Sequence, residues 1–236
     1  MPWSARWNSH QNHPQILNLN MAIEKLLSIA SSATVAKVVS NISLPTQQVG
    51  GESFQELVQM ISAKNGFYAF EGALHVLPWV ASTGPGPIIG LQAWNESKLW
   101  RDWYQGITDG LFFFAEDIFG GQFAIRGNEI VSFEPESGEI AVVAPTLDRW
   151  AAEILLNYVR LTGYSLAQSW QLSNGPIAVG KRLLPKIPFI LGGAYEDTNL
   201  HAVDAVQGMR YRGELWEQLR DLPDGAQVRL KVLPLQ

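Results

Sequence analysis

The sequence predicts an α+β protein: a central antiparallel β-meander packed with helices, with N-terminal helices and a C-terminal helix-strand unit. Apolar residues recur at helical spacing in the segments 16–61 and 147–161. Between these segments lie closely spaced apolar runs at 111–115, 122–126 and 129–133, separated by glycine turns. The elements do not alternate in a β-α-β rhythm, which favours α+β over α/β.

The N-terminal third begins with a polar stretch that contains two prolines. We therefore expect a flexible tail at 1–15 and a single α+β domain at 16–236. Helical spacing predicts two helices between residues 16 and 42 and a third at 54–61. Ser53, with Glu56 three residues later, predicts a capping box at the start of this third helix.

The segment before the meander predicts short elements. The aromatic stretch 67–79 indicates a short helix ending at Pro78, and the glycine- and proline-rich stretch 82–87 indicates a loop. Residues 88–94 are typical of a strand and residues 96–104 of a short helix. The meander then follows, with its last strand at 139–143.

The C-terminal part predicts a long helix, an extended segment and a helix-strand unit. Thr146 is placed to cap a helix whose buried stripe includes Trp150 and that ends at Gly163. Two prolines in 182–191 favour an extended edge segment. The last elements are a helix at 208–221 and a half-buried strand at 228–232.

Composition limits the class of protein. Hydrophobic residues make up 47% of the chain and charged residues 17%, which is enough apolar material for a packed core. Cysteine is absent, which excludes disulfides, thiol catalysis and thiolate metal sites, and fits a reducing compartment. We find no secretory signal at the N-terminus, and charged and proline residues interrupt the most apolar region, 67–94. These features predict a cytoplasmic protein that does not enter a membrane.

The negative charge is concentrated in one segment. Residues 96–140 contain nine acidic and three basic side chains, so the rest of the chain is almost neutral although the whole carries −5. This distribution argues against nucleic-acid binding, for which a basic patch supplies most of the affinity. It predicts an acidic face that meets a basic partner protein. The alternative is that these acids only keep the surface soluble.

The sequence contains no motif that indicates catalysis or a cofactor. There is no nucleophile elbow, phosphate loop or dinucleotide-binding glycine pattern. His10 and His13 have a spacing that suits a metal, but they lie in the polar tail without a third ligand. We therefore predict no catalytic residue, no cofactor, no metal and no enzyme activity. The only candidates for the alternative, a small-ligand-binding protein or enzyme, are the carboxylates Glu116, Asp117, Glu134 and Glu136.

Seven residues form the predicted partner-binding set. Trp94, Trp100 and Trp103 flank the acidic segment, and aromatic side chains dominate binding energy when an interface buries them. The alternative for these tryptophans is a packed core under a short helix. The set is completed by the four acidic residues Glu116, Asp117, Glu134 and Glu136.

The run from Leu111 to Ile125, which contains Phe-Ala-Glu-Asp before a glycine turn, is similar to the SUKH superfamily. The hairpin residues 130–139 and a helix beginning near Trp150 continue the similarity, which extends from Asn65 to Leu161. The chain departs from the family before the sheet, where residues 67–79 replace the expected leucine-proline-tyrosine segment.

Many members of that superfamily are immunity proteins of bacterial toxin systems, and others regulate cell-wall synthesis or act as adaptors. The resemblance implies a cytoplasmic protein that binds and neutralises a cognate toxin, often a nuclease or another cytoplasmic effector, without catalysis. An adaptor or scaffold for an endogenous partner is the alternative that the family offers. Because partner surfaces vary within the family, the resemblance assigns no individual interface residue.

Overall fold

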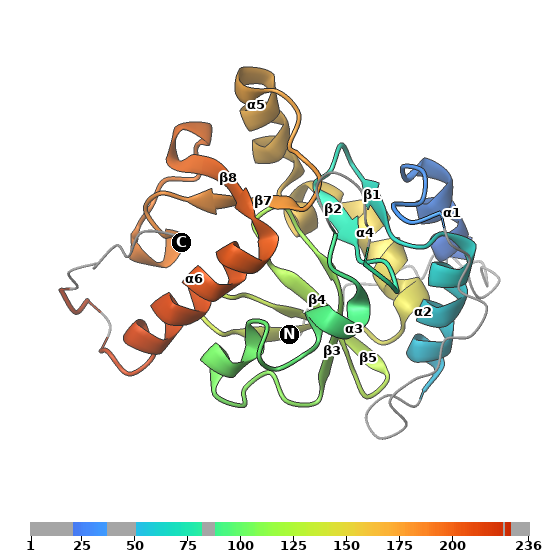
Figure 1. Ribbon diagram of the computed structural model, residues 1–236, viewed down its shortest axis with the longest axis horizontal. Helices are drawn as coiled ribbons and strands as arrows, with labels where there is room; N and C mark the ends of the chain where they lie inside the picture. Colours follow the sequence, from blue (N-terminus) through green and yellow to red (C-terminus); the bar gives the residue numbers. More distant parts are fainter. Residues whose placement is uncertain (1–20, 37–50, 82–87, 224, 228–236) are drawn as a thin grey trace, which may run out of the picture.

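The computed structural model describes residues 21–36, 51–81, 88–223 and 225–227. The predicted tail and the predicted final strand at 228–232 lie outside these residues. Within them the fold is α+β, as predicted: six α-helices accompany a six-stranded antiparallel sheet and a two-stranded sheet (Figure 1). Every helix among these residues is too short or too polar to cross a bilayer.

The larger sheet is a meander in which each strand pairs with the next along the chain. Its strands are β1 (Phe67–Ala69), β2 (Leu74–Val76), β3 (Leu111–Glu116), β4 (Gln122–Arg126), β5 (Glu129–Phe133) and β6 (Ile140–Ala144). The last four strands confirm the predictions made from short apolar runs and glycine turns. The signal is local, because tight turns between antiparallel strands need only a few residues of suitable turn chemistry.

The prediction of a helix in 67–79 is wrong, because β1 and β2 form a hairpin there. Its turn, Phe70-Glu71-Gly72, has positive φ at all three residues, with values of 52°, 54° and 90°. A left-handed conformation costs about 1–2 kcal/mol for a residue with a side chain. Phe70 is held in it by stacking on Tyr158 of helix α4, with ring centroids 4.6 Å apart. A tertiary contact therefore selects this turn.

Residues 88–104 also differ from prediction. The predicted strand at 88–94 is wrong, since Leu91–Trp94 is a short helix, α3. Residues 96–104 form only a 3₁₀ turn, η1 (Arg101–Tyr104). Asn95 fixes this segment against the sheet, because its side chain accepts from the Phe113 amide at 2.8 Å and donates to the Phe113 carbonyl at 2.8 Å.

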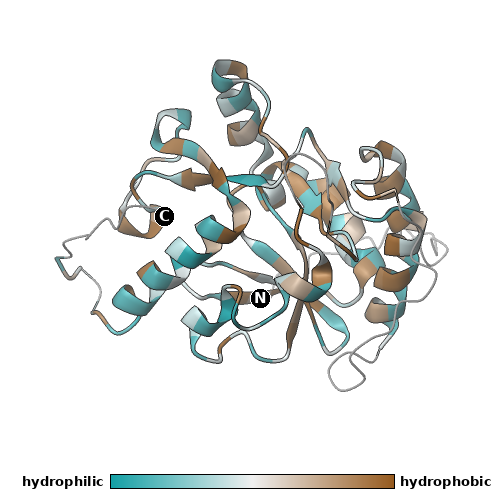
Figure 2. Ribbon diagram, in the orientation of Figure 1, coloured by the Kyte–Doolittle hydropathy of each residue, from teal (hydrophilic) through white to brown (hydrophobic). Residues whose placement is uncertain are grey.

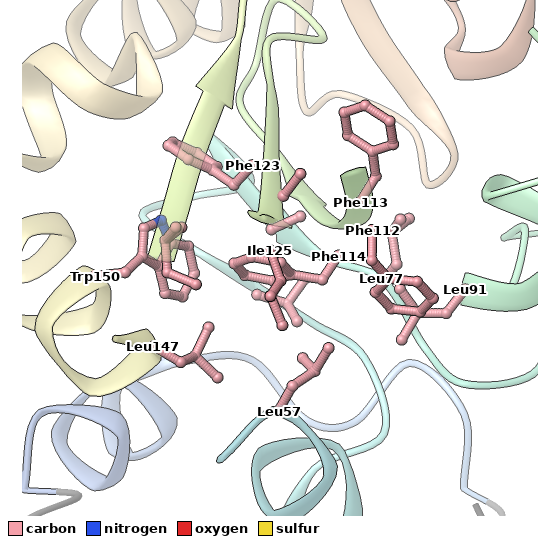
Figure 3. Close-up of a cluster of buried hydrophobic side chains, with 14 of the residues drawn as sticks. Leu57, Leu77, Leu91, Phe112, Phe113, Phe114, Phe123, Ile125, Leu147 and Trp150 are labelled. Atoms are coloured by element: carbon pink, nitrogen blue, oxygen red, sulfur yellow. The ribbon is translucent and has the colours of Figure 1, made fainter. Parts of the chain in front are cut away.

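One face of the larger sheet is covered by α1 (Met21–Ile29), α2 (Glu52–Ala63) and α4 (Leu147–Thr162). Phe54 of α2 meets Phe112 edge to face, and Trp150 of α4 meets Phe114 and Phe123 in the same way. Figure 3 shows Trp150, Leu147 and Leu57 converging on these side chains. The predicted cap of α4 is confirmed, because the Thr146 side chain accepts from the Arg149 amide.

The capping box predicted for α2 is wrong. Glu56 turns away from its own helix, and its Oε2 accepts from the amides of Leu147 and Asp148, at 2.9 Å and 3.3 Å. Ser53 donates instead to the carbonyl oxygen of Asn128. These side chains satisfy polar groups at the start of α4 and in the β4–β5 turn, so they join elements that are distant in sequence.

The opposite face of the sheet is covered by α3, η1 and α6 (Ala205–Leu219). Here Trp100 is fully buried, and Tyr104 of η1 lies 5.4 Å from Trp216 of α6, between ring centroids. Figure 2 shows both teal and brown residues along α2 and α6, as expected for helices that bury one side against a sheet. The sheet is therefore the middle of three layers.

A second, two-stranded sheet lies beside the larger one, after α5 (Tyr164–Asn174). It pairs β7 (Lys181–Pro185) with β8 (Leu200–Asp204), and the connection between them contains the 3₁₀ turns η2 (Phe189–Leu191) and η3 (Asp197–Asn199). The Leu183 amide donates to the Ile118 carbonyl at 2.8 Å, which joins β7 to the β3–β4 turn. This hairpin, orange in Figure 1, positions the loop described next.

Candidate partner-binding surface

The structure places the three predicted tryptophans in the layer between the sheet and α6. Trp94 is 1% exposed and donates from Nε1 to Gln122 Oε1 at 2.9 Å. Trp100 is enclosed by other rings, and Trp103 is half-buried against Gly213 of α6, where a Cβ would approach the Trp103 side chain to 2.5 Å. Trp94 and Trp100 thus have almost no surface that a partner could touch, and they serve packing.

Glu116 is also inside the protein. Its Oε1 accepts from His75 Nδ1 and pairs with Arg182 Nε, both at 2.9 Å. Burial alone would raise the pKa of Glu116, but Arg182 and then His75 hold that pKa below its usual value. Glu116 is therefore an ionised group that joins β2, β3 and β7, and it does not reach the surface.

Asp117 and Glu134 lie together in a groove on the surface. Its walls come from the β3–β4 turn, strands β4 and β5 and the end of α4, which contributes Arg160, and its free volume is about 130 Å³. Asp117 Oδ1 accepts from the amides of Phe119 and Gly121, both at 2.8 Å, so its position is fixed by the turn. We call this feature the acidic groove.

The pKa values of both carboxyl groups in the acidic groove are raised. Burial, and then the negative charge of Glu134, raise the pKa of Asp117 to about 7. The pKa of Glu134 is raised as well, first by desolvation of its carboxyl group and then by the negative charges of Glu136 and Glu139, although much of this side chain is exposed. The buried guanidinium of Arg212 opposes both shifts. A positive charge that entered the groove from outside would favour the ionised form of both carboxyl groups.

Glu136 holds a loop next to this groove. It is 4% exposed, and its Oε2 accepts from the Ile190 amide at 3.0 Å. Ile190 belongs to the connection between β7 and β8, residues 186–199, which we call the β7–β8 loop. Glu136 thus acts by positioning this loop and has little surface of its own.

The β7–β8 loop presents exposed apolar side chains. Tyr195 is 70% exposed and stacks flat on Phe189, with ring centroids 3.9 Å apart. Ile187 and Ile190 are also exposed. Desolvation, then the negative charges of Glu134, Glu136 and Asp117, raise the pKa of Tyr195, so its phenol stands in the field of the acidic groove. The loop and the groove therefore form one surface.

The backbone of this loop is held rigidly. The Asn199 side chain accepts from the Ile187 amide at 2.9 Å and donates to the carbonyls of Ile187 and Ala194, both at 3.0 Å. Gly193 lies so close to Ile187 that a Cβ would meet its carbonyl oxygen at 1.9 Å. Only glycine fits at this position. The loop is thus set in one conformation before any partner arrives.

Of the seven predicted residues, the structure brings Asp117 and Glu134 together on the surface, with Glu136 just behind them. It adds Tyr195, Phe189 and Asn199, which the sequence reasoning did not select. The two prolines in 182–191 predicted an extended edge segment, which the structure has only as far as Pro185, and nothing local indicated that the following residues would fold back beside Glu134. The strand β8 that returns from this loop was missed as well.

Replacing Asp117 with asparagine tests the raised pKa of this carboxyl group. Because the folded-state pKa of about 7 lies above the usual value of 3.8, the folded protein binds the extra proton between these values. Asp117 therefore makes the folded state less stable as pH rises from about 4 to 7. Asp117→Asn keeps the Oδ1 acceptor but has no proton to lose. We expect the free energy of unfolding of this variant, relative to that of the parent protein, to increase by roughly 1–2 kcal/mol as the pH is raised from 5 to 8. Urea unfolding at both pH values measures this; a constant difference would contradict it.

Among the described residues, no group of three or more histidine, aspartate or glutamate side chains is arranged to hold a metal ion. His201 is half-buried on β8, and His75 is buried beside Glu116. His10 and His13 lie outside the part of the chain that the structure describes.

Comparison with known proteins gives a partial structural likeness. No protein-family model matches the chain, and no curated protein matches it. Among solved structures, the chain is similar to Atu4351 from Agrobacterium tumefaciens, with a TM-score of 0.45 and 11% sequence identity. The match covers 68% of this chain and 75% of that one. Membership of the SUKH superfamily therefore stays a prediction.

Proposed function

We propose that this protein acts in the cytoplasm as an immunity protein, which binds a cognate toxin with a basic surface and neutralises it. The observation that supports this proposal most is the joined surface of the acidic groove and the β7–β8 loop. Glu134 and the partly protonated Asp117 supply negative charge in a concave site whose wall also contains Arg160, and Tyr195 supplies an exposed aromatic ring beside it.

Each part of this surface suits a step of protein association. Complementary charge raises the rate of encounter with a basic partner. An aromatic side chain that becomes buried at an interface is among the residues that most often dominate affinity. The fixed conformation of the loop lowers the entropy that binding would cost. A lysine or arginine side chain of the toxin entering the acidic groove would relieve the repulsion between Asp117 and Glu134.

Two substitutions separate these contributions. We expect Glu134→Lys to slow association and to weaken its dependence on salt, because it reverses one charge of the acidic groove. We expect Tyr195→Ala to weaken binding by about 30-fold through faster dissociation, as is typical of an aromatic hot spot. Surface plasmon resonance at several salt concentrations, using the toxin that the chain suppresses on co-expression, measures both.

Glu24→Lys is the matched control for charge reversal. Glu24 is exposed on α1, which is capped by Asp148 at the start of α4, whereas the groove lies at the end of α4. This variant should bind like the parent protein. If Glu134→Lys and Tyr195→Ala bound as Glu24→Lys does, the proposed surface would be refuted.

The toxin itself must be identified first. Tagged protein from the native organism is captured with its partners, and each candidate is then tested for toxicity that this chain suppresses on co-expression. An adaptor would instead be required by cells without any toxin, so growth of a deletion strain distinguishes the two functions.

The acidic groove also supports a second candidate function, the binding of a small cationic ligand. The raised pKa of Asp117 beside Glu134 is the observation that favours it. Titration calorimetry with small alkylamines and guanidinium compounds tests this function, and saturable binding that Glu134→Gln abolishes would support it.

A further inference from the structure

A buried polar cluster joins the two sheets and is incompletely hydrogen-bonded. It consists of His75 on β2, Glu116 on β3 and Arg182 on β7, each no more than 2% exposed. His75 and Glu116 are direct neighbours across the β2–β3 pair. Each of these side chains has buried atoms without a hydrogen-bond partner among the described residues: His75 Nε2, Glu116 Oε2, and Arg182 Nη2 and Nε, the last of which lies in the ion pair with Glu116. Buried polar atoms are rarely left unpaired in folded proteins.

The ionisation states of the three side chains determine which of the unpaired atoms are hydrogen-bond donors and which are acceptors. Arg182 lies 2.9 Å from Glu116 and keeps the carboxylate ionised. The hydrogen bond of 2.9 Å between His75 Nδ1 and Glu116 Oε1 then requires the proton on Nδ1. Burial lowers the pKa of His75, although the hydrogen bond with Glu116 opposes this shift, so the imidazole is neutral and its Nε2 is a hydrogen-bond acceptor. Stacking on Tyr68, with ring centroids 4.3 Å apart, fixes the plane of the imidazole.

A cavity adjoins two of these side chains. His75 and Glu116 line it together with Trp94 and Ile88, and Asp204 and Ala205 at the start of α6 form another part of its wall. Its volume is about 20 Å³. A water molecule needs at least about 10–15 Å³ measured in this way, so the cavity has room for one or two waters and not for a metabolite.

We propose that this cavity is a binding site for ordered water, in which a water molecule donates a hydrogen bond to Nε2 of His75. Water suits the site because it is neutral and can donate to the acceptors His75 Nε2 and Glu116 Oε2. A cation is not required there, since Arg182 already balances the charge of Glu116. The water completes the polar cluster that connects β7, and with it the β7–β8 loop, to β2 and β3. This inference does not depend on the proposed function.

Two measurements on the parent protein and its variants test the water site. Magnetic relaxation dispersion counts long-lived internal waters, and we expect His75→Phe to lose one or two of them. The matched control is His201→Phe: His201 also has an unpaired buried nitrogen, Nδ1, but does not line the cavity. This control should retain the count of the parent protein.

The nitrogen chemical shifts of His75 in the parent protein give a readout that needs no substitution. We expect a protonated Nδ1 and an Nε2 shifted from the value of a bare imine nitrogen toward that of a hydrogen-bonded one. A bare Nε2, or an equal number of internal waters in the parent protein and His75→Phe, would overturn the proposal. If His75→Phe does not fold, the chemical shift alone decides.

Discussion

Replacing Glu116 with leucine is expected to lower the free energy of unfolding by about 3–5 kcal/mol, because it leaves a buried cation without its partner. Arg182 is 2% exposed, and Glu116 is the acid with which it forms an ion pair of 2.9 Å. The same substitution removes the acceptor of the His75 Nδ1 proton. Equilibrium unfolding in urea measures the loss.

A double-mutant cycle shows whether the loss comes from the unpaired charge. Glu116→Leu combined with Arg182→Met should be much less destabilised than the sum of the two single variants, because no buried charge remains. The surface pair Arg126–Glu129 is the control, since both side chains are about 40% exposed. Glu129→Leu should cost no more than about 1 kcal/mol. Additive losses at Glu116 and Arg182 would show that the pair is not coupled.

The burial of Glu116 also decides how the acidic surface must be probed. Reversing the charges of Glu116 and Asp117 together is the change that the sequence by itself suggests for testing an acidic face. In the structure, a lysine at position 116 would stand next to Arg182 inside the protein, so this double variant would lose stability and not report on binding. Glu134 is exposed at the rim of the acidic groove and is the suitable position.

Replacing Trp100 with alanine is expected to lower the free energy of unfolding by about 3–5 kcal/mol, the range for deletion of a large buried aromatic side chain. Trp100 has no exposed surface. Its ring lies 4.9 Å from that of Phe113 and 5.9 Å from those of Trp94 and Tyr104, between centroids. Loss of the indole would open a cavity between the sheet and η1.

Two further variants check this explanation in the same unfolding experiment. Trp100→Phe should cost less than Trp100→Ala, because a ring remains and the unpaired buried Nε1 hydrogen of Trp100 is removed. Trp103→Ala should also cost less, because Trp103 is only half-buried. A loss below about 1 kcal/mol for Trp100→Ala would show that this aromatic cluster contributes little to stability.

Local patterns were sufficient for the last four strands of the larger sheet and for the longest helix. Short apolar runs and glycine turns predict β3 to β6, and Thr146 with Gly163 marks the ends of α4. These features depend on residues a few positions apart. For the same reason, the sequence placed Asp117 and Glu134 close to strand ends, where the structure has them.

Elements whose conformation depends on distant partners were not predictable in this way. The β1–β2 turn adopts left-handed geometry because Phe70 stacks on Tyr158, and Glu56 leaves its own helix because the start of α4 offers unpaired amides. In the candidate site, too, some residues could be predicted from local sequence and others depend on distant contacts. Tyr195 becomes a neighbour of the acidic groove only because Glu136 and Asn199 fix the β7–β8 loop there.

The sequence by itself determined the fold class, the order of the meander strands and the acidic character of the central segment, because periodicity, turn residues and charge are local properties. Only the tertiary structure decided which of those acids face solvent. Glu116 is the last residue of β3 and Asp117 lies in the turn that follows, and no local pattern in the sequence indicates which of the two is buried. Arg182, brought in by the β7–β8 hairpin, compensates the buried charge of Glu116 and leaves Asp117 at the groove.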